Sequence, residues 1–164
     1  MALALAQAGA TVVLWARQTD RLARAARAIN ALGRTSLIQR VDVTDPAAVR
    51  RAVRQTLRRV RRVDILVNNA GIWGGDPLVT LSLKTWSKVL ATDLTSVFAV
   101  SQAVAPSMIR RRYGKIINIS STSAILAHPE GAAYCAAKAG VVHLTRVMAV
   151  ELGSAGIRVR GLSP

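Results

Sequence analysis

Short apolar runs recur along the chain and alternate with longer segments rich in alanine, leucine and arginine. The first run, Ala10 to Ala16 (ATVVLWA), is β-branched and has no polar alternation. This pattern is typical of a strand covered on both faces in a parallel sheet. Comparable runs predict four further strands, at Ser36 to Val41, Val63 to Val67, Lys115 to Ile119 and Ile157 to Leu162.

The segments between these runs have helical composition and carry boundary signals. Gly33 and Gly153 stand where C-caps are expected, and Asp45 followed by Pro46 predicts an N-cap and a first helical position. Pro106 predicts a kink. The predicted helices span Asp20 to Leu32, a segment that begins at Asp45-Pro46, Leu83 to Arg112 and Ala132 to Leu152, and Met1 to Gly9 has the composition of a helix end.

Strands that alternate with helices indicate βαβ units with right-handed crossovers. The fold class predicted is therefore α/β, with a doubly wound, Rossmann-like parallel sheet in a three-layer αβα arrangement. The chain has 164 residues, of which 51% are apolar, and contains no internal repeat or linker-like stretch. We therefore expect residues 1–164 to form one domain.

The composition argues against nucleic-acid-binding, membrane-spanning and metal-cluster proteins. The net charge of +15 comes almost entirely from arginine, and no aromatic residues interleave with the densest arginine group to stack bases, so we interpret it as a solvated helix face without a nucleic-acid partner. No apolar run reaches the roughly 18 to 20 residues of a membrane span. One cysteine and two histidines provide no metal cluster, and we expect a reducing, cytoplasmic compartment.

Tyr134 and Lys138 are the clearest candidates for catalytic residues. They stand four apart at the start of a predicted helix and so share one face. An ammonium beside a phenol stabilises the phenolate, which allows the phenol to exchange a proton with a carbonyl or alcohol oxygen. Ser121, just past the predicted strand that ends at Ile119, places a hydroxyl at the carboxyl end of the sheet, where ligands bind in open α/β folds.

Four segments resemble the short-chain dehydrogenase/reductase family in its order and spacing: ILVNNAG (Ile65 to Gly71), IINISS (Ile116 to Ser121), AAYCAAKAGV around Tyr134, and IRVRGLSP (Ile157 to Pro164). The likeness covers essentially the whole chain and extends to 3-oxoacyl-carrier-protein reductases. The resemblance implies that Tyr134 is the general acid/base, that Lys138 binds the nicotinamide ribose and lowers the pKa of Tyr134, and that Ser121 positions the substrate oxygen.

The resemblance also implies a dinucleotide site. Ala16 and Arg17 stand at the carboxyl end of the first strand, where an acidic residue would favour NAD. Because the carboxylate is absent and a guanidinium is present, NADP is the preferred cofactor and NAD the alternative. The remaining predicted cofactor contacts are Asp42, Val43, Asn69, Ala70, Gly71, Tyr134, Lys138 and Pro164.

The chain departs from the family pattern at three places. Asp93 stands where many members have an asparagine that holds a water in a proton relay with the lysine, and its negative charge would oppose a Tyr134 phenolate. The family's first strand and Gly-rich turn have no counterpart here, and neither does its last strand. We therefore expect an incomplete domain in which the strands at Ala10 and Ser36 lack a neighbour joining them to the rest, and a polypeptide that folds poorly and binds no dinucleotide.

The predicted function is transfer of a hydride between NAD(P) and a carbonyl or secondary-alcohol substrate. The predicted partners are that small molecule and further copies of the chain, since residues 93–112 and 132–152 carry more apolar positions than one buried face needs. The alternative is a non-catalytic fragment or pseudoenzyme that only associates with related subunits.

Overall fold

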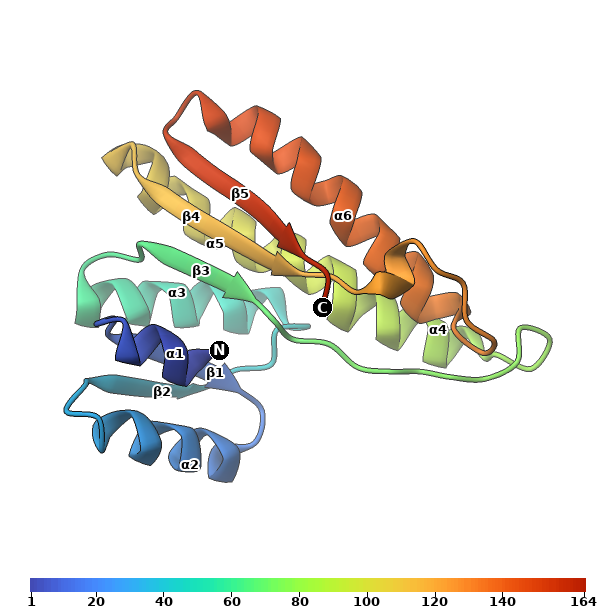
Figure 1. Cartoon of the computed structure of the whole chain (residues 1–164), viewed down its shortest axis with the longest axis horizontal. Coiled ribbons are helices and arrows are strands. Elements are labelled where there is room, and N and C mark those ends of the chain that lie inside the picture. The colour runs from blue at the N-terminus through green and yellow to red at the C-terminus, as the bar shows by residue number, and fades with distance from the viewer.

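Five strands form two separate parallel sheets in the computed structural model, which describes residues 1–164 (Figure 1). In the first sheet, β1 (Val12–Ala16) pairs with β2 (Ser36–Arg40). In the second, β4 (Gly114–Ile119) lies between β3 (Ile65–Asn68) and β5 (Ile157–Leu162). All five predicted strands are confirmed, and only their bounds differ slightly.

The predicted helices are confirmed, with one irregularity. Asp45 caps its helix as expected, because its carboxylate accepts hydrogen bonds from the amides of Ala47 and Ala48. The long helix predicted from Leu83 is divided by a π-helical turn, which the sequence pattern did not predict. The helices are α1 (Ala2–Gln7), α2 (Thr19–Asn30), α3 (Pro46–Val60), α4 (Leu83–Leu90), the π turn η1 (Ala91–Thr95), α5 (Ser96–Arg111), the 3-10 turn η2 (Thr122–Ala124) and α6 (Ala132–Gly153).

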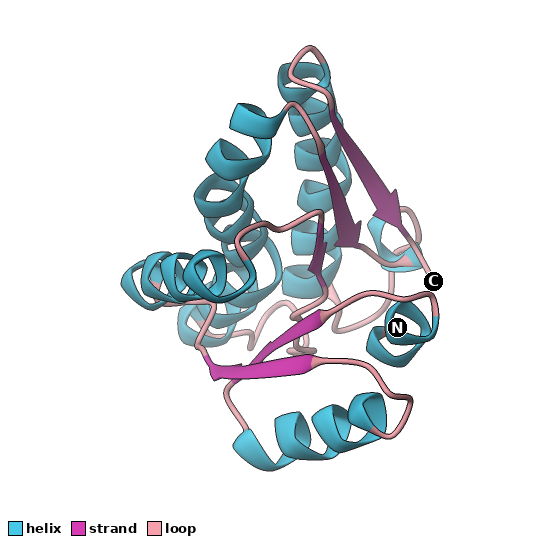
Figure 2. Cartoon of the chain, turned by 90° about the vertical axis from the view of Figure 1, so that its left-hand side faces the viewer, coloured by secondary structure: helices cyan, strands magenta, loops and turns pink.

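Helices cover the sheets from two sides, which gives the expected αβα layering (Figure 2). α1 and α2 pack on the β1–β2 sheet, whereas α3, α5 and α6 share one apolar core with β4 and β5. In β5 the side chains of Ile157 and Val159 are buried and those of Arg158 and Arg160 are exposed. This strand is therefore covered on one face only, unlike the strand buried on both faces that its apolar run suggested.

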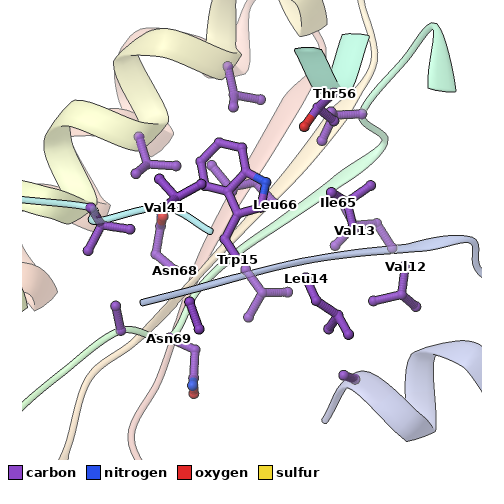
Figure 3. A pocket seen from close by; sticks show the side chains of 18 of the residues that line it. Val12, Val13, Leu14, Trp15, Val41, Thr56, Ile65, Leu66, Asn68 and Asn69 are labelled. Carbon is purple, nitrogen blue, oxygen red and sulfur yellow. The ribbon is translucent and has the colours of Figure 1, made fainter. Parts of the chain in front are cut away.

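An apolar-lined gap separates the two sheets. It has a volume of about 1340 Å³ and lies between β1 and β3, and no backbone hydrogen bond joins these two strands. The indole of Trp15 projects from β1 into the gap beside Leu66 (Figure 3). The expectation that β1 and β2 lack a strand joining them to β3 and β4 is confirmed.

The segment Leu83–Arg111 is the one helical stretch whose length and composition would let it span a membrane. Half of its most apolar part is buried inside the protein, where Val97, Val100 and Val104 belong to the main core. Packing in a core accounts for its apolar composition.

Candidate active site

Tyr134 and Lys138 lie in the first turns of α6, beside the carboxyl end of β4. The ammonium nitrogen of Lys138 is 5.4 Å from the centroid of the Tyr134 ring, so the two side chains share a helix face as predicted. Lys138 is only 4% exposed, and its Nζ donates a hydrogen bond to the carbonyl of Ile119 at 3.2 Å. The ammonium is therefore held at the end of β4 rather than in solvent.

Two serines follow β4 and have different roles in the structure. Ser120 is buried, and its hydroxyl donates to the backbone carbonyl of Lys138 at 3.0 Å, which ties α6 to the end of the strand. Ser121 caps the start of η2, where its Oγ accepts a hydrogen bond from the Ser123 amide at 3.2 Å. Ser121 thus keeps the position directly after the strand that the sequence predicted, whereas the anchoring role of Ser120 was not foreseen.

Asp93 is fully buried in the π turn η1, and both of its oxygens face the site. Oδ1 accepts a hydrogen bond from the Ile72 amide at 2.8 Å. Oδ2 lies 3.3 Å from Nζ of Lys138 and accepts no hydrogen bond of good geometry. Burial raises the pKa of the Asp93 carboxyl above its ordinary value, while the Ile72 amide and the Lys138 ammonium act in the opposite direction.

The loop after β3 closes over this carboxylate. A Cβ at Gly71 would lie 2.9 Å from Oδ2 of Asp93 and 3.4 Å from Nζ of Lys138, so a larger residue would displace one of the two charges. The indole of Trp73 lies with its centroid 5.0 Å from that of Tyr134, at an interplanar angle of 57°. Gly71, Asp93, Tyr134 and Lys138 therefore form one cluster, drawn from three separate parts of the chain.

A buried amide network supports the strand ends below the cluster. The side-chain amide of Asn68 donates to Asn118 at 2.8 Å and to Ser101 at 2.9 Å, and the amide of Asn118 donates to Thr145 at 2.9 Å. These four side chains link β3, β4, α5 and α6. The sequence pattern did not predict this network, although an asparagine inside an apolar strand signals a buried partner.

The predicted cofactor residues of the first sheet lie apart from this cluster. Asp42 accepts hydrogen bonds from the hydroxyl and the amide of Thr44 at 2.7 and 2.9 Å. These contacts lower the pKa of Asp42. The hydrogen bond from the Thr44 hydroxyl has the largest effect, and the Thr44 amide and the positive charge of Arg17 add to it. The predicted cofactor residues that line the gap between the sheets are Ala16, Arg17, Asp42, Val43, Asn69, Ala70 and Gly71.

Other predicted residues stand outside that gap. Ser121, Tyr134, Lys138 and Pro164 do not line it, and Pro164 is exposed beyond β5. The structure thus divides the predicted site into an outer part along the gap and an inner part around Lys138, with Gly71 common to both.

The sequence and the fold are similar to those of known proteins. The model of the short chain dehydrogenase family matches residues 1–164. Gluconate 5-dehydrogenase from Gluconobacter oxydans is 42% identical over 100% of this chain and 64% of its own length. 3-Oxoacyl-[acyl-carrier-protein] reductase from Synechocystis is 38% identical over 99% of this chain and 66% of its own length. The chain therefore spans just under two thirds of these curated relatives.

A solved structure of a related enzyme has the same fold as this chain. The crystal structure of a gluconate 5-dehydrogenase from Burkholderia cenocepacia, in complex with NADP and tartrate, superposes with a TM-score of 0.92 at 41% identity. The superposition covers 98% of this chain and 63% of that one.

Proposed function

Because this chain belongs to the short chain dehydrogenase family, we propose that it serves hydride transfer between NADP and a carbonyl or secondary-alcohol substrate. The observation that carries the proposal is the buried ammonium of Lys138, 5.4 Å from the Tyr134 ring at the carboxyl end of β4. An ammonium in this place stabilises negative charge on the phenol oxygen. Such a phenol can return a proton to a developing alkoxide.

Tyr134, Ser121 and Lys138 each have a role in this proposal. In the reducing direction, Tyr134 gives its proton to the substrate oxygen as the hydride forms a bond to the carbonyl carbon. The Ser121 hydroxyl holds the same oxygen and stabilises the charge that develops on it. Lys138 binds the cofactor ribose and favours the phenolate that remains. When bound, the dinucleotide supplies the hydride or, in the oxidising direction, accepts it.

The residues along the gap fit a dinucleotide that carries a 2′-phosphate. Arg17 follows β1 directly and is exposed, and no carboxylate occupies the end of that strand. Asp42 and Val43 stand at the end of β2, and Asn69 to Gly71 lead from β3 towards Lys138. The structure of a relative in complex with NADP supports the same choice, and NAD is the alternative.

The proposal is tested by following NADPH oxidation with a panel of carbonyl compounds. We expect Tyr134→Phe to reduce the rate by about 10² to 10⁴-fold, because it removes a positioned general acid. The matched control is Tyr113→Phe, since Tyr113 is 49% exposed and lies outside the cluster. Equal rates for the protein and Tyr134→Phe, or no NADPH oxidation by the folded protein, would contradict the proposal.

The open gap between the sheets favours a second candidate, a non-catalytic subunit that associates with related chains. The unpaired edges of β1 and β3 face the gap, which has a volume of about 1340 Å³. The outer part of the cofactor site therefore has no continuous sheet beneath it. A folded protein that binds no NADPH yet forms complexes would support this candidate over the first.

We also propose that copies of the chain associate through residues 93–112 and 132–152. Apolar side chains are exposed on both segments, namely Phe98, Ile109, Val147 and Val150, the last at 82%. Large exposed apolar positions on neighbouring helices are typical of an interface. We expect Val150→Glu to lower the sedimentation coefficient in ultracentrifugation, whereas Val79→Glu, on the loop before α4, leaves it unchanged; equal coefficients for both variants would contradict this interface.

A further inference from the structure

We propose that Asp93 is a positioning residue whose carboxylate ties the loop after β3 to the catalytic helix, and that this tie loosens when the carboxylate is neutralised. The inference rests on the proposed function, because it concerns the same cluster. It goes beyond that function by assigning a separate, acid-sensitive role to a residue that does not itself exchange a proton with substrate.

The Asp93 carboxylate contacts two different segments, one through each of its oxygens. One oxygen of Asp93 accepts the Ile72 amide at 2.8 Å, and the other lies 3.3 Å from the Lys138 ammonium. Ile72 belongs to the loop and Lys138 to α6, so a single carboxylate spans the two. Trp73, the next residue of the loop, lies against Tyr134 of the same helix at 5.0 Å. The position of the indole on the phenol is therefore set through Asp93.

Burial makes the tie depend on charge. Asp93 is 0% exposed and Lys138 is 4% exposed, so neither charge is solvated by water if the other is lost. Oδ2 has no further hydrogen-bond donor. An amide side chain at this position would still accept the Ile72 amide, but it would offer Lys138 no negative charge. The ionic half of the tie is thus specific to the carboxylate.

The direction of the pH dependence follows from the groups around the carboxyl. Lys138 is the charged group that acts on Asp93, Tyr134 is the titratable group beside Lys138, and the other polar contact is the Ile72 amide. Burial raises the pKa of Asp93 above 3.8. The ion pair is therefore present above this raised pKa and is lost as the pH falls through it. A neutral carboxyl is easier to bury, and the Lys138 ammonium keeps its hydrogen bond to the carbonyl of Ile119. We therefore expect the surrounding fold to be retained while the tie loosens.

The test uses the fluorescence of Trp73, obtained as the difference between the protein and its Trp73→Phe variant, during an acid titration. We expect the emission to shift, with a midpoint above pH 3.8, before far-ultraviolet circular dichroism changes. Asp93→Asn and Lys138→Met remove the ion pair from opposite ends. Each is expected to give the acid-form emission already at neutral pH and to show no transition, so one variant suffices if the other fails to fold.

Asp64→Asn is the matched control, because Asp64 pairs with Arg111 at 2.9 Å outside the cluster; this variant is expected to keep the transition. The proposal is overturned if Trp73 shows no transition, if the transition persists in both Asp93→Asn and Lys138→Met, or if it coincides with loss of circular dichroism. The titration needs neither cofactor nor substrate. Its result is therefore independent of the NADPH oxidation assay, and each proposal can fail alone.

Discussion

Buried polar side chains at the ends of β3 and β4 determine how the cluster is held. Asn118 is fully buried, accepts from the amide of Asn68 and donates to the hydroxyl of Thr145. Its side chain therefore joins β4 both to β3 and to α6. Because α6 carries Tyr134 and Lys138, the Asn118 amide connects the sheet to the helix that carries the proposed catalytic residues.

We expect Asn118→Leu to destabilise the protein by about 2 to 4 kcal/mol, because it leaves the amide of Asn68 and the hydroxyl of Thr145 without one of their buried partners. The measurement is the urea midpoint at unchanged slope. Lys115→Gln on the same strand is the control, since Lys115 is exposed and its replacement should shift the midpoint little. A loss below about 0.5 kcal/mol for Asn118→Leu would show that the network is not needed for stability.

Helix boundaries set the direction in which each element enters the next. The N-cap of α3 is Asp45, followed by Pro46, and its C-cap is Arg61, which has φ of 64°. A positive φ allows the chain to turn sharply from α3 towards β3, but it places Cβ of a non-glycine residue in a strained position. The arginine at this position thus supports the turn at a cost in stability.

We expect Arg61→Gly to stabilise the protein by about 0.5 to 1 kcal/mol, because glycine adopts this conformation without strain. Arg58→Gly, one turn earlier at a position that is also exposed, should instead destabilise it by about 1 kcal/mol, because glycine is unfavourable inside a helix. Thermal unfolding of both variants measures the difference. If the two substitutions change the melting temperature in the same direction, the strain at Arg61 is not the cause.

The molecule as a whole consists of two sheets, and helices pack more extensively on one of them than on the other. The sheet β3–β4–β5 is backed by the main core of α3, α5 and α6. The β1–β2 sheet is backed by α1 and α2, and an apolar-lined gap of about 1340 Å³ separates it from β3. Open edges and exposed apolar surface lower local stability.

We expect hydrogen exchange to separate the two units. Amides of β1 and β2 should exchange through openings of lower free energy than those of β4, because no backbone hydrogen bonds connect the first sheet to the second. Mass spectrometry of peptides from each strand measures the rates. The amides of α2 serve as an internal reference within the first unit. Equal protection of β1 and β4 would show that the gap does not divide the molecule.

The apolar runs, the Asp45-Pro46 cap and the spacing of Tyr134 and Lys138 are local features, and the sequence by itself therefore determined the strands, most helix bounds and the pair on one helix face. The family signatures likewise placed Ser121 after β4. The π turn at Ala91–Thr95, the Ser120 anchor, the Asn118 network and the contact of Asp93 with both Ile72 and Lys138 were decided only by the tertiary structure. These features depend on distances between segments far apart in the chain. No local pattern encodes such a distance, because it arises only when the helices pack on the sheet.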